Sequence, residues 1–515
     1  MHTTRDDTLS ESNDTPHDIA EPVLVAVILT HIDVTRCGEF AVLASPETTV
    51  ARLSPLFVGG GARAVPRGLA DLYLSRQGEL TITRTSDGVE LQSLKDRSAM
   101  FVNGRPLEGC AILGRDQLRS GILLELGRRA TLWLTEMDEA PDVTEKWGIR
   151  GLHPSVRALR KQILVAASSD SALIVGEPGS GKELVAAAYH AERCPNESPY
   201  LALNLASLTD ELAASTLFGH TKGAFTGAAA DRRGLFVDAA DGAVFLDEIG
   251  ACSLGVQASM LRLLEEREVM PIGAPRSVPF NASVVAATDS DLADAIARGD
   301  FRALLYYRLA KSTLDVPPLR MRTFDIPLLF LHFAEQFSVR TFGVSLRRDK
   351  RPWLLPAQVR TLLAYQWPGN IRELRNVAEG VATRCWGEDH ASLPLLENVG
   401  VVLPAQSIEM KPTEALPAHK ERADLSLLTK ANVLGALELS VFSAGSAAKA
   451  LGVSRTSMYA LMAKHGIRRS NELEKVDLQG ALLAYQGDVD AAALSLRISA
   501  RAFKNRAGEV GMTLA

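Results

Sequence analysis

The sequence lacks the features that mark secreted, membrane-spanning or metal-binding proteins. Its 515 residues include five cysteines, which stand singly, with no Cys-x-x-Cys pair and no His cluster at zinc spacing. The first 21 residues are polar and acidic, which argues against a signal peptide. The longest apolar run near the start covers residues 23–29, far fewer than the roughly 20 that a membrane span needs. We therefore expect a cytoplasmic protein without a bound metal cluster, beginning with a loose tail over residues 1–21.

An excess of basic charge is also missing. The chain has 56 Lys and Arg against 61 Asp and Glu, a net charge of −5, so any contact with nucleic acid must lie on a local patch. No Asp-rich receiver domain is evident, so we do not expect control by aspartyl phosphorylation. Hydrophobic residues make up 46% of the chain, enough for real cores, and the length exceeds what one core serves. We expect several domains.

Composition and periodicity divide the chain. Residues 22–137 consist of short β-rich runs broken by Gly, Pro and Asp, which predicts a β-sandwich. Residues 147–402 alternate strand-like and helix-like segments, which predicts an α/β domain. A proline-containing stretch over 403–424 is typical of a linker, and the helical remainder divides at residue 470. The runs expected as strands are 23–29, 40–43, 72–74, 79–83, 88–91, 100–102, 122–126 and 131–134 in the sandwich, and 172–175, 243–246 and 283–286 in the α/β domain.

A glycine-rich loop follows the first of these α/β runs. It reads Gly176-Glu177-Pro178-Gly179-Ser180-Gly181-Lys182 and leads into helix-forming residues. Such a loop lets backbone N–H groups surround phosphates at a helix N-terminus, while Lys182 reaches the β- and γ-phosphates. Glu183 stands where many P-loops carry the Ser or Thr that binds Mg²⁺. Alone, the pattern is also compatible with an ordinary turn.

A pair of carboxylates ends the next apolar run. Asp247 and Glu248 follow residues 243–246, so Asp247 would hold Mg²⁺, directly or through water, and Glu248 would polarise an attacking water. Adjacent acids at a strand end are often only solvated. Together and in this order, the two motifs predict a nucleotide-hydrolysing domain that uses ATP and Mg²⁺.

A third motif carries a family resemblance. Gly223-Ala224-Phe225-Thr226-Gly227-Ala228 matches, letter for letter, the GAFTGA loop with which sigma-54 activators contact the sigma factor. The resemblance continues through residues 217–220, 301–302, 306–309, 317–320 and 367–374, and it covers about half the chain. The chain therefore resembles the sigma-54-dependent bacterial enhancer-binding proteins. These are AAA+ ATPases with a small helical lid, and the resemblance implies that the chain acts on sigma-54 RNA polymerase.

The resemblance also implies roles for single residues. Arg302 and Arg308 would reach the γ-phosphate held by a neighbouring subunit, which requires a ring such as a hexamer. Arg372 would contact the nucleotide from the lid, and Asn204 would hold Glu248 back until the nucleotide state changes. Each arginine alone would more simply form a surface salt bridge.

Several positions depart from the family pattern. Asp289 replaces the usual Asn of the sensor strand, Ala303-Leu304 replaces Glu-Asp, and Thr221 replaces Glu before the contact loop. These changes leave a second hypothesis open, in which the motor is impaired and the chain is a DNA-binding scaffold or repressor. A third hypothesis is a remodeller unrelated to transcription.

Residues 425–470 have the pattern of a helix-turn-helix. An Ala-Ala pair, a Leu-Gly-Val turn and a Ser-capped second helix resemble the Fis-type module of the same family. Double-stranded DNA would be the partner, although a hairpin that only packs on something is the alternative. The residues we expect at the DNA are the cap Ser454 and the helix residues Arg455, Thr456, Ser457, Tyr459 and Lys464.

Residues 471–515 repeat this pattern. A shift of 45 positions aligns Ala447, Ala448, Leu451, Val453, Ser454, Met458, Gly466 and Ile467 with Ala492, Ala493, Leu496, Ile498, Ser499, Phe503, Gly511 and Met512. The second copy is either another DNA reader or a degenerate copy kept for dimer packing.

The β-rich segment resembles a forkhead-associated (FHA) domain, the sandwich that binds phosphothreonine. Residues 57–59, 75–76 and 101–104 carry the resemblance, but Gly60, Gly78 and Ser98 replace the family's phosphate and backbone contacts. Ser75 and Arg76 remain as the expected phosphopeptide residues. The alternative is a sandwich used for oligomer contacts or another partner.

Overall fold

The computed structural model describes residues 22–59, 65–94, 100–142, 146–194, 198–348, 351–393, 409–411 and, with short gaps, 455–512, together with scattered residues between 430 and 448. The chain forms two compact units, Met1–Pro412 and Thr413–Ala515. No helix within these described segments is long and apolar enough to cross a membrane.

The first part of the larger unit, residues 22–137, is built from two antiparallel sheets and is called the two-sheet domain below. The first sheet has the order β2-β1-β10-β9-β6-β7 and the second β20-β8-β5-β4-β3. Their bounds are β1 Val23–Thr30, β2 Phe40–Val42, β3 Glu47–Val50, β4 Leu80–Thr85, β5 Gly88–Ser93, β6 Met100–Val102, β7 Arg105–Pro106, β8 Cys110–Gly114, β9 Ile122–Leu126, β10 Ala130–Met137 and β20 Glu409–Lys411, with helix α1 at Arg115–Ser120.

The first sheet is buried on both faces. Along β1 the even-numbered residues from Leu24 to Ile28 belong to the core between the two sheets. The odd-numbered residues from Val25 to Leu29 belong to a different core, which they share with helices far along the chain. Strands covered on both sides are apolar throughout rather than alternating. This explains why residues 23–29 form the longest apolar run near the start of the sequence.

The strands of this domain differ from the prediction at five places. Residues 72–74 form a turn, because the Asp71 carboxylate accepts the backbone N–H of Tyr73 at 2.9 Å and Leu72 points into solvent. The strands β3, β7 and β8 were not predicted. The segment predicted as a linker contributes β20, which pairs antiparallel with β8 and covers an edge that would otherwise leave backbone groups unpaired.

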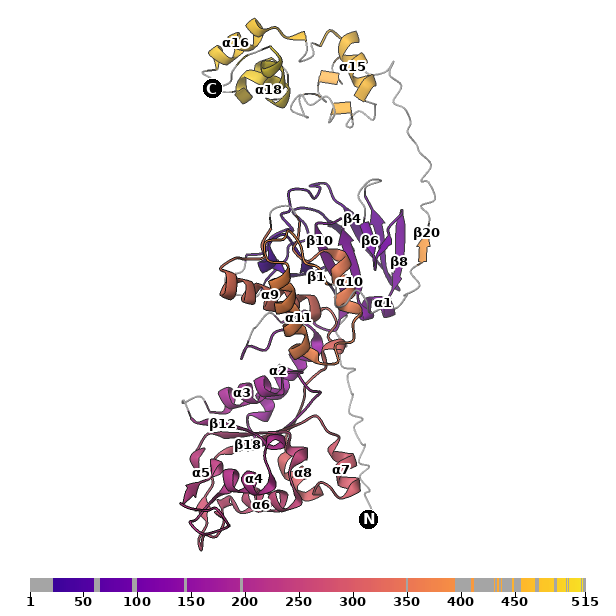
Figure 1. Cartoon of the computed structure of the whole chain (residues 1–515). Coiled ribbons are helices and arrows are strands. Elements are labelled where there is room, and N and C mark those ends of the chain that lie inside the picture. The colour runs from indigo at the N-terminus through magenta and orange to yellow at the C-terminus, as the bar shows by residue number, and fades with distance from the viewer. Residues whose placement is uncertain are drawn as a thin grey trace, which may run out of the picture. The chain divides into compact units, whose positions relative to one another are not determined.

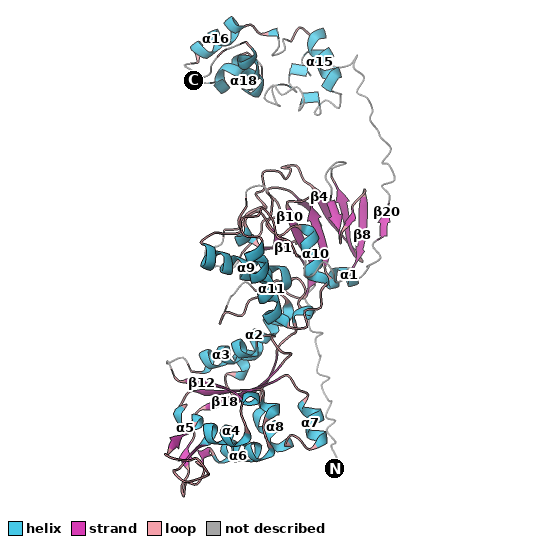
Figure 2. Cartoon of the chain, in the orientation of Figure 1, coloured by secondary structure: helices cyan, strands magenta, loops and turns pink. Residues whose placement is uncertain are grey.

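The second part of the larger unit is a five-stranded parallel sheet between two layers of helices (Figure 2). Its order is β12-β15-β18-β11-β19, and the three predicted buried runs lie in β11, β15 and β18, which confirms the α/β prediction. The strands are β11 Ser171–Val175, β12 Tyr200–Asn204, β15 Ala243–Asp247, β18 Ser283–Thr288 and β19 Thr313–Asp315.

Helices cover both faces of this sheet. The helices α2 Pro154–Ala166 and α3 Lys182–Arg193 pack on one face. The other face carries α4 Asp210–Phe218, α5 Leu235–Asp238, α6 Leu254–Glu266, α7 Leu292–Arg298 and α8 Ala303–Leu309. Two small hairpins complete this layer, β13 Gly219–His220 with β14 Arg232–Arg233, and β16 Glu268–Val269 with β17 Val278–Pro279.

A helical lid follows the parallel sheet. It begins with the short 3-10 helix η4 Leu319–Met321 and continues with α9 Asp325–Phe342, α10 Pro356–Ala364 and α11 Asn370–Arg384. These three α-helices lie against the β1–β10 side of the two-sheet domain (Figure 1), and their apolar residues share one core with it.

The smaller unit is helical. It contains α15 Arg455–Lys464, α16 Lys475–Ala484, α17 Val489–Ser495 and α18 Ala500–Glu509. Two separate apolar clusters form within it, one around Met458 and one around Phe503. These two residues align in the internal repeat, as do the alanine pairs 447–448 and 492–493, which are buried in the same two clusters. The repeat is therefore present in the packing as well as in the sequence.

Candidate nucleotide site and contact loop

The glycine-rich loop connects β11 to α3 at the carboxyl edge of the parallel sheet. Gly179 and Gly181 have φ values of +73° and +109°, a backbone region that favours glycine. A Cβ on Gly179 would also overlap the carbonyl oxygen of Gly369 in the lid. The Ser180 hydroxyl is buried and makes no hydrogen bond to any residue that the structure describes. A loop with open backbone groups at a helix start and an unused hydroxyl fits a phosphate chain.

Lys182 connects this loop to the end of β15. Its Nζ donates to the carbonyl oxygen of Gly176 at 3.0 Å and lies 3.6 Å from Oε1 of Glu248. Glu248 has a left-handed backbone (φ 57°), which turns its side chain out of the strand direction. Partial burial and a hydrogen bond with Asp289 raise the pKa of Glu248, and the Lys182 ammonium opposes this rise. Lys182 and Asp289 thus both interact with the carboxylate of Glu248.

The structure places Asn204 beside Asp247. Its Nδ2 donates to Oδ2 of Asp247 at 2.9 Å, and the nucleotide-dependent hold of Asn204 on Glu248 stays a prediction. The cause is strand register, because β12 and β15 are parallel neighbours with Asn204 directly opposite Asp247. Glu248 lies one residue beyond this pairing and faces Lys182 instead.

Oxygen ligands for Mg²⁺ are available from two elements. The pKa of the Tyr200 hydroxyl is raised by burial and then by the negative charges of Glu183 and Asp247. Carboxylate oxygens are the ligands that Mg²⁺ prefers in proteins, usually one or two together with nucleotide phosphates. Glu183 therefore offers an oxygen near the position where other P-loops use a hydroxyl.

The lid contacts the glycine-rich loop directly. Arg320 binds the Glu177 carboxylate through two hydrogen bonds of 2.7 and 2.6 Å, and Asn370 Nδ2 adds a third at 3.0 Å. The bonds from Arg320 and then Asn370 lower the pKa of Glu177 to about 2. The backbone N–H groups of Ile371 and Arg372 donate to the carbonyl oxygen of Gly179 at 3.0 and 3.3 Å. The position of the lid is thereby tied to the conformation of the loop.

Sequence reasoning placed Arg372 at this site but assigned no role to Arg320 or Asn370. Both lie in segments that carried the family resemblance, 317–320 and 367–374, so a signal was present. Their partner, Glu177, is about 140 and 190 residues away along the chain, and no pattern in the sequence indicates that pairing.

The structure does not bring Arg302 and Arg308 to this site. Both side chains are exposed at the ends of α8. Arg302 Nε donates to the carbonyl oxygen of Leu254 at 3.2 Å, and Arg308 lies 3.3 Å from Glu265. Both arginines are therefore exposed and contact α6, not the glycine-rich loop.

The GAFTGA segment forms the tip of the β13–β14 hairpin. Gly223 and Gly227 have φ values of +80° and +104° and open space where a Cβ would lie, so they turn the chain without being packed. The Gly223 N–H donates to the carbonyl oxygen of Ala228 at 2.9 Å and closes the loop. Phe225 is 37% exposed and packs edge-on against His220, with ring centroids 4.8 Å apart. Residues 223–228 thus form a compact loop with an exposed aromatic ring and an exposed Thr226.

The residues predicted at the DNA are placed only in part. Ser454 lies outside the described residues, and Arg455 and Thr456 begin α15 with side chains that are also outside them. Ser457 and Tyr459 are half-buried, and Lys464 is exposed at the end of the helix.

The predicted phosphopeptide residues lie on a loop before β4. The Ser75 hydroxyl accepts the N–H of Gln77 at 3.1 Å, and the Ser75 N–H donates to Glu79 at 2.6 Å. Arg76 is exposed, and Ser98 lies outside the described residues.

A cavity of about 590 Å³ lies away from the glycine-rich loop. Residues of the two-sheet domain, the start of the α/β domain and α9 line it, among them Arg67, Leu152 and His332. It belongs to the contact between the domains.

Comparisons with known proteins agree with this geometry. The model of the sigma-54 interaction domain matches residues 149–315, and that of the AAA+ ATPase lid domain matches residues 320–396. The transcriptional regulatory protein ZraR of Escherichia coli K12 is 39% identical over 330 residues, which are 63% of this chain and 71% of that protein. GlrR of the same organism is 38% identical over 331 residues, 63% of this chain and 70% of that protein.

Two further comparisons extend over similar shares of the chain. The C4-dicarboxylate transport regulator DctD of Pseudomonas aeruginosa is 40% identical over 318 residues, 62% of this chain and 64% of that protein. Among solved structures, NtrX from Brucella abortus in complex with ATP is 27% identical, covers 62% of this chain and 69% of its own, and has a TM-score of 0.43.

The parallel sheet, its glycine-rich loop and the matched lid define an AAA+ domain with a sigma-54 interaction segment. The chain belongs to the family of sigma-54-interacting transcriptional regulators.

Proposed function

We propose that this protein is a DNA-binding transcriptional activator that uses ATP hydrolysis to remodel the closed complex of sigma-54 RNA polymerase. The observation that carries the proposal is the meeting of Lys182, Asp247 and Glu248 at one edge of the sheet. The exposed loop at residues 223–228 belongs to the same domain, so movement caused by the nucleotide can reach it through packed helices.

Each residue of the site has its own role in this proposal. Backbone N–H groups of the glycine-rich loop and Lys182 bind the phosphates, and Arg372 contacts the nucleotide from the lid. Asp247, which accepts a hydrogen bond from Asn204, would hold Mg²⁺ together with Glu183, and the ion would supply positive charge against that of the phosphates. Glu248 orients the attacking water and accepts its proton.

The remaining partners are proposed from the family resemblance. Arg302 and Arg308, which are both exposed, act on the nucleotide of the neighbouring subunit in a ring, a hexamer. The α15 helix reads DNA with the repeat of residues 471–515 beside it as a second helix-turn-helix or a dimer contact. Ser75 and Arg76 remain as the phosphothreonine site of an FHA-like sandwich, with oligomer contacts as the alternative.

A second candidate function has one specific observation in its favour. Burial and then the hydrogen bond with Asp289 raise the pKa of Glu248, against the effect of Lys182, and so oppose the ionised form that accepts a proton. A strongly impaired motor would leave a DNA-binding scaffold or repressor.

ATP turnover by the full chain, measured beside a Lys182→Ala variant, separates these functions. Turnover well above the variant supports the activator, while equal rates with DNA binding retained would leave the scaffold. Promoter opening by a Thr226→Ala variant then tests the target. The activator requires loss of opening with ATP turnover retained, whereas unchanged opening would assign the motor to another substrate.

A further inference from the structure

The outer face of the first sheet in the two-sheet domain is a docking surface whose partner lies in the same chain. On β9 and β10 the outward residues Leu123, Trp133 and Met137 are buried with lid residues, as are Val25, Val27 and Leu29 on β1. The Trp133 ring lies 6.3 Å from that of Phe324, just before α9. Release of the lid would expose this whole face to water, so the contact is part of the folded state.

Polar contacts surround this apolar face. Arg360 of α10 forms an ion pair with Glu125 of β9, whose carboxylate is almost completely buried. The turn between β6 and β7 lies beside the same arginine, because a Cβ on Gly104 would be 3.0 Å from Arg360 Cδ. A buried carboxylate left without its partner is strongly unfavourable, so the pair fixes the lid in one register on the sheet.

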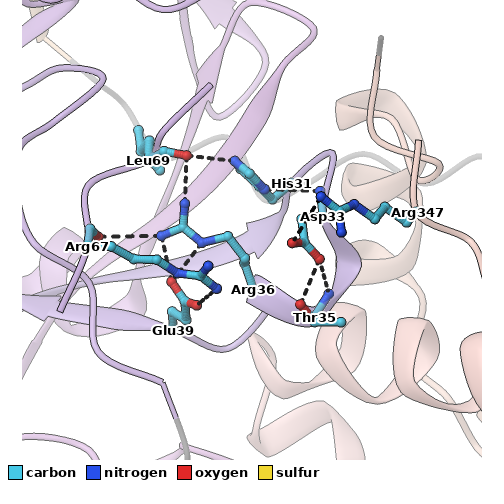
Figure 3. A network of polar contacts seen from close by, with 8 residues as sticks. All are labelled: His31, Asp33, Thr35, Arg36, Glu39, Arg67, Leu69 and Arg347. Carbon is cyan, nitrogen blue, oxygen red and sulfur yellow. Dashed lines mark hydrogen bonds and ion pairs between the residues drawn. The ribbon is translucent and has the colours of Figure 1, made fainter. Parts of the chain in front are cut away.

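A second polar contact lies at the end of β1 (Figure 3). The N–H of Arg348 donates to the carbonyl oxygen of Ile32 at 3.0 Å, and the Arg347 side chain lies 4.0 Å from Asp33. The segment that carries Asp33 has polar contacts of its own within the two-sheet domain. The buried Arg36 donates hydrogen bonds to Glu39 and to the carbonyl oxygen of Leu69. The contact therefore joins the segment after α9 to a part of the two-sheet domain that has its own internal polar contacts.

The same lid reaches the nucleotide site at its other end. The body of α11 contributes Leu374, Ala378 and Val381 to the core shared with the sheet. Its first turn donates two backbone hydrogen bonds to Gly179, and Asn370 binds Glu177. A continuous packed path thus leads from β1 through α9 and α11 to the glycine-rich loop.

We propose that the two-sheet domain and the helical lid form one rigid unit, called the fixed body, and move together. The domain then controls the nucleotide site from within the same chain, by setting the position of the lid on the glycine-rich loop, and not by detaching from the motor. The fixed body stands on the packing alone, while its effect on nucleotide rests on the proposed function.

Hydrogen exchange of the full chain without nucleotide, measured by mass spectrometry, tests whether the two-sheet domain and the lid form one rigid unit. Val27→Asp places a charge in the docking surface and is expected to speed exchange in α9 and α10 by roughly tenfold or more. Gln92→Asp adds the same charge on an exposed position of β5 and should leave these helices unchanged. Lid exchange at the normal rate in a folded Val27→Asp protein would overturn the proposal.

Arg360→Ala covers the case in which Val27→Asp does not fold. It breaks the ion pair from the lid side and should speed exchange in β9 and β10, which are in the other domain. Unchanged exchange in both strands would contradict a fixed body.

A non-hydrolysable ATP analogue then tests the coupling. In the natural sequence the analogue should slow hydrogen exchange in β1, β10 and α11. In the Val27→Asp protein it should slow exchange in α11 alone. Slowing confined to α11 in both proteins would refute the coupling. No slowing anywhere would refute nucleotide binding, and hence the proposed function, while the nucleotide-free result would still decide the fixed body.

Discussion

Glu248 is surrounded by charges that oppose each other. Lys182 lies 3.6 Å from its carboxylate, whereas Asp289 forms a hydrogen bond with it and adds a negative charge. Burial and Asp289 raise the pKa of Glu248, and Lys182 lowers it. A proton acceptor must be ionised, so this environment should slow turnover at acidic pH.

Asp289→Asn should therefore speed ATP turnover below neutral pH. The amide removes the like charge, and its NH2 group can donate a hydrogen bond to the ionised Glu248 carboxylate. The acid limb of the rate profile should move to lower pH, with roughly a tenfold gain at low pH for each pKa unit. Steady-state turnover between pH 5.5 and 8 measures this effect, with the exposed Asp294→Asn as control. An unmoved acid limb would show that Asp289 does not govern Glu248.

Sequence reasoning found the residues of this site whose type is dictated by chemistry. Lys182, Asp247 and Glu248 follow apolar strands in a fixed order, so their meeting at one sheet edge was predictable. The partner of Asn204 was not predictable, because it depends on the register of two strands that no local pattern sets. The same holds for Arg320 and Asn370 on Glu177.

Among the elements, the short helix α1 ends at a glycine that leaves room for the Trp133 ring of β10. Gly114 precedes it and Gly121 follows it. A Cβ on Gly121, whose φ is +87°, would overlap the Trp133 ring, while a Cβ on Gly114 would meet nothing within 4 Å. Trp133 in turn packs against Phe324 before α9. The end of α1 therefore sets the position of a ring in the docking surface.

Gly121→Ala should destabilise the two-sheet domain and its contact with the lid. Overpacking costs about 1–3 kcal/mol, and the unfavourable φ adds to it. Gly114→Ala is the matched control and should stay within about 0.5 kcal/mol of the natural sequence. Denaturant unfolding of the full chain, followed by tryptophan fluorescence, measures both. Equal midpoints for the two variants would show that the Trp133 ring is free to move aside.

Over the whole molecule, two histidines occupy the junction of the domains. His153 caps α2 and packs on Phe324 with centroids 5.4 Å apart, and His332 lies on α9 at the cavity. Burial and then Arg322 lower the pKa of His153 to about 4. Burial, Arg150 and Arg375 lower the pKa of His332 to about 4 as well. Both side chains are therefore neutral in the folded protein at neutral pH.

Acid should weaken this junction. The unfolded chain binds a proton at each histidine near pH 6.5, while the folded chain binds it only near 4. Their contribution to stability is thus complete above pH 6.5 and is lost as the pH falls from about 6.5 toward 4. The thermal midpoint should fall less between pH 7.5 and 5.5 in His332→Gln than in the natural sequence. The exposed His390→Gln is the control, and an identical pH dependence in all three proteins would contradict the argument.

The sequence by itself determined the candidate site and the α/β domain that carries it, because the glycine-rich loop, the paired acids and the GAFTGA loop are local patterns that need particular residues at fixed spacing. The sequence also shows β1 as an unbroken apolar run, which indicates a strand buried on both faces. It does not show which element covers the second face. Only the tertiary structure decided that the lid covers it, that Asn204 faces Asp247, and that Arg320 reaches Glu177. These contacts join segments more than 40 residues apart, and their partners are selected by packing rather than by spacing along the chain.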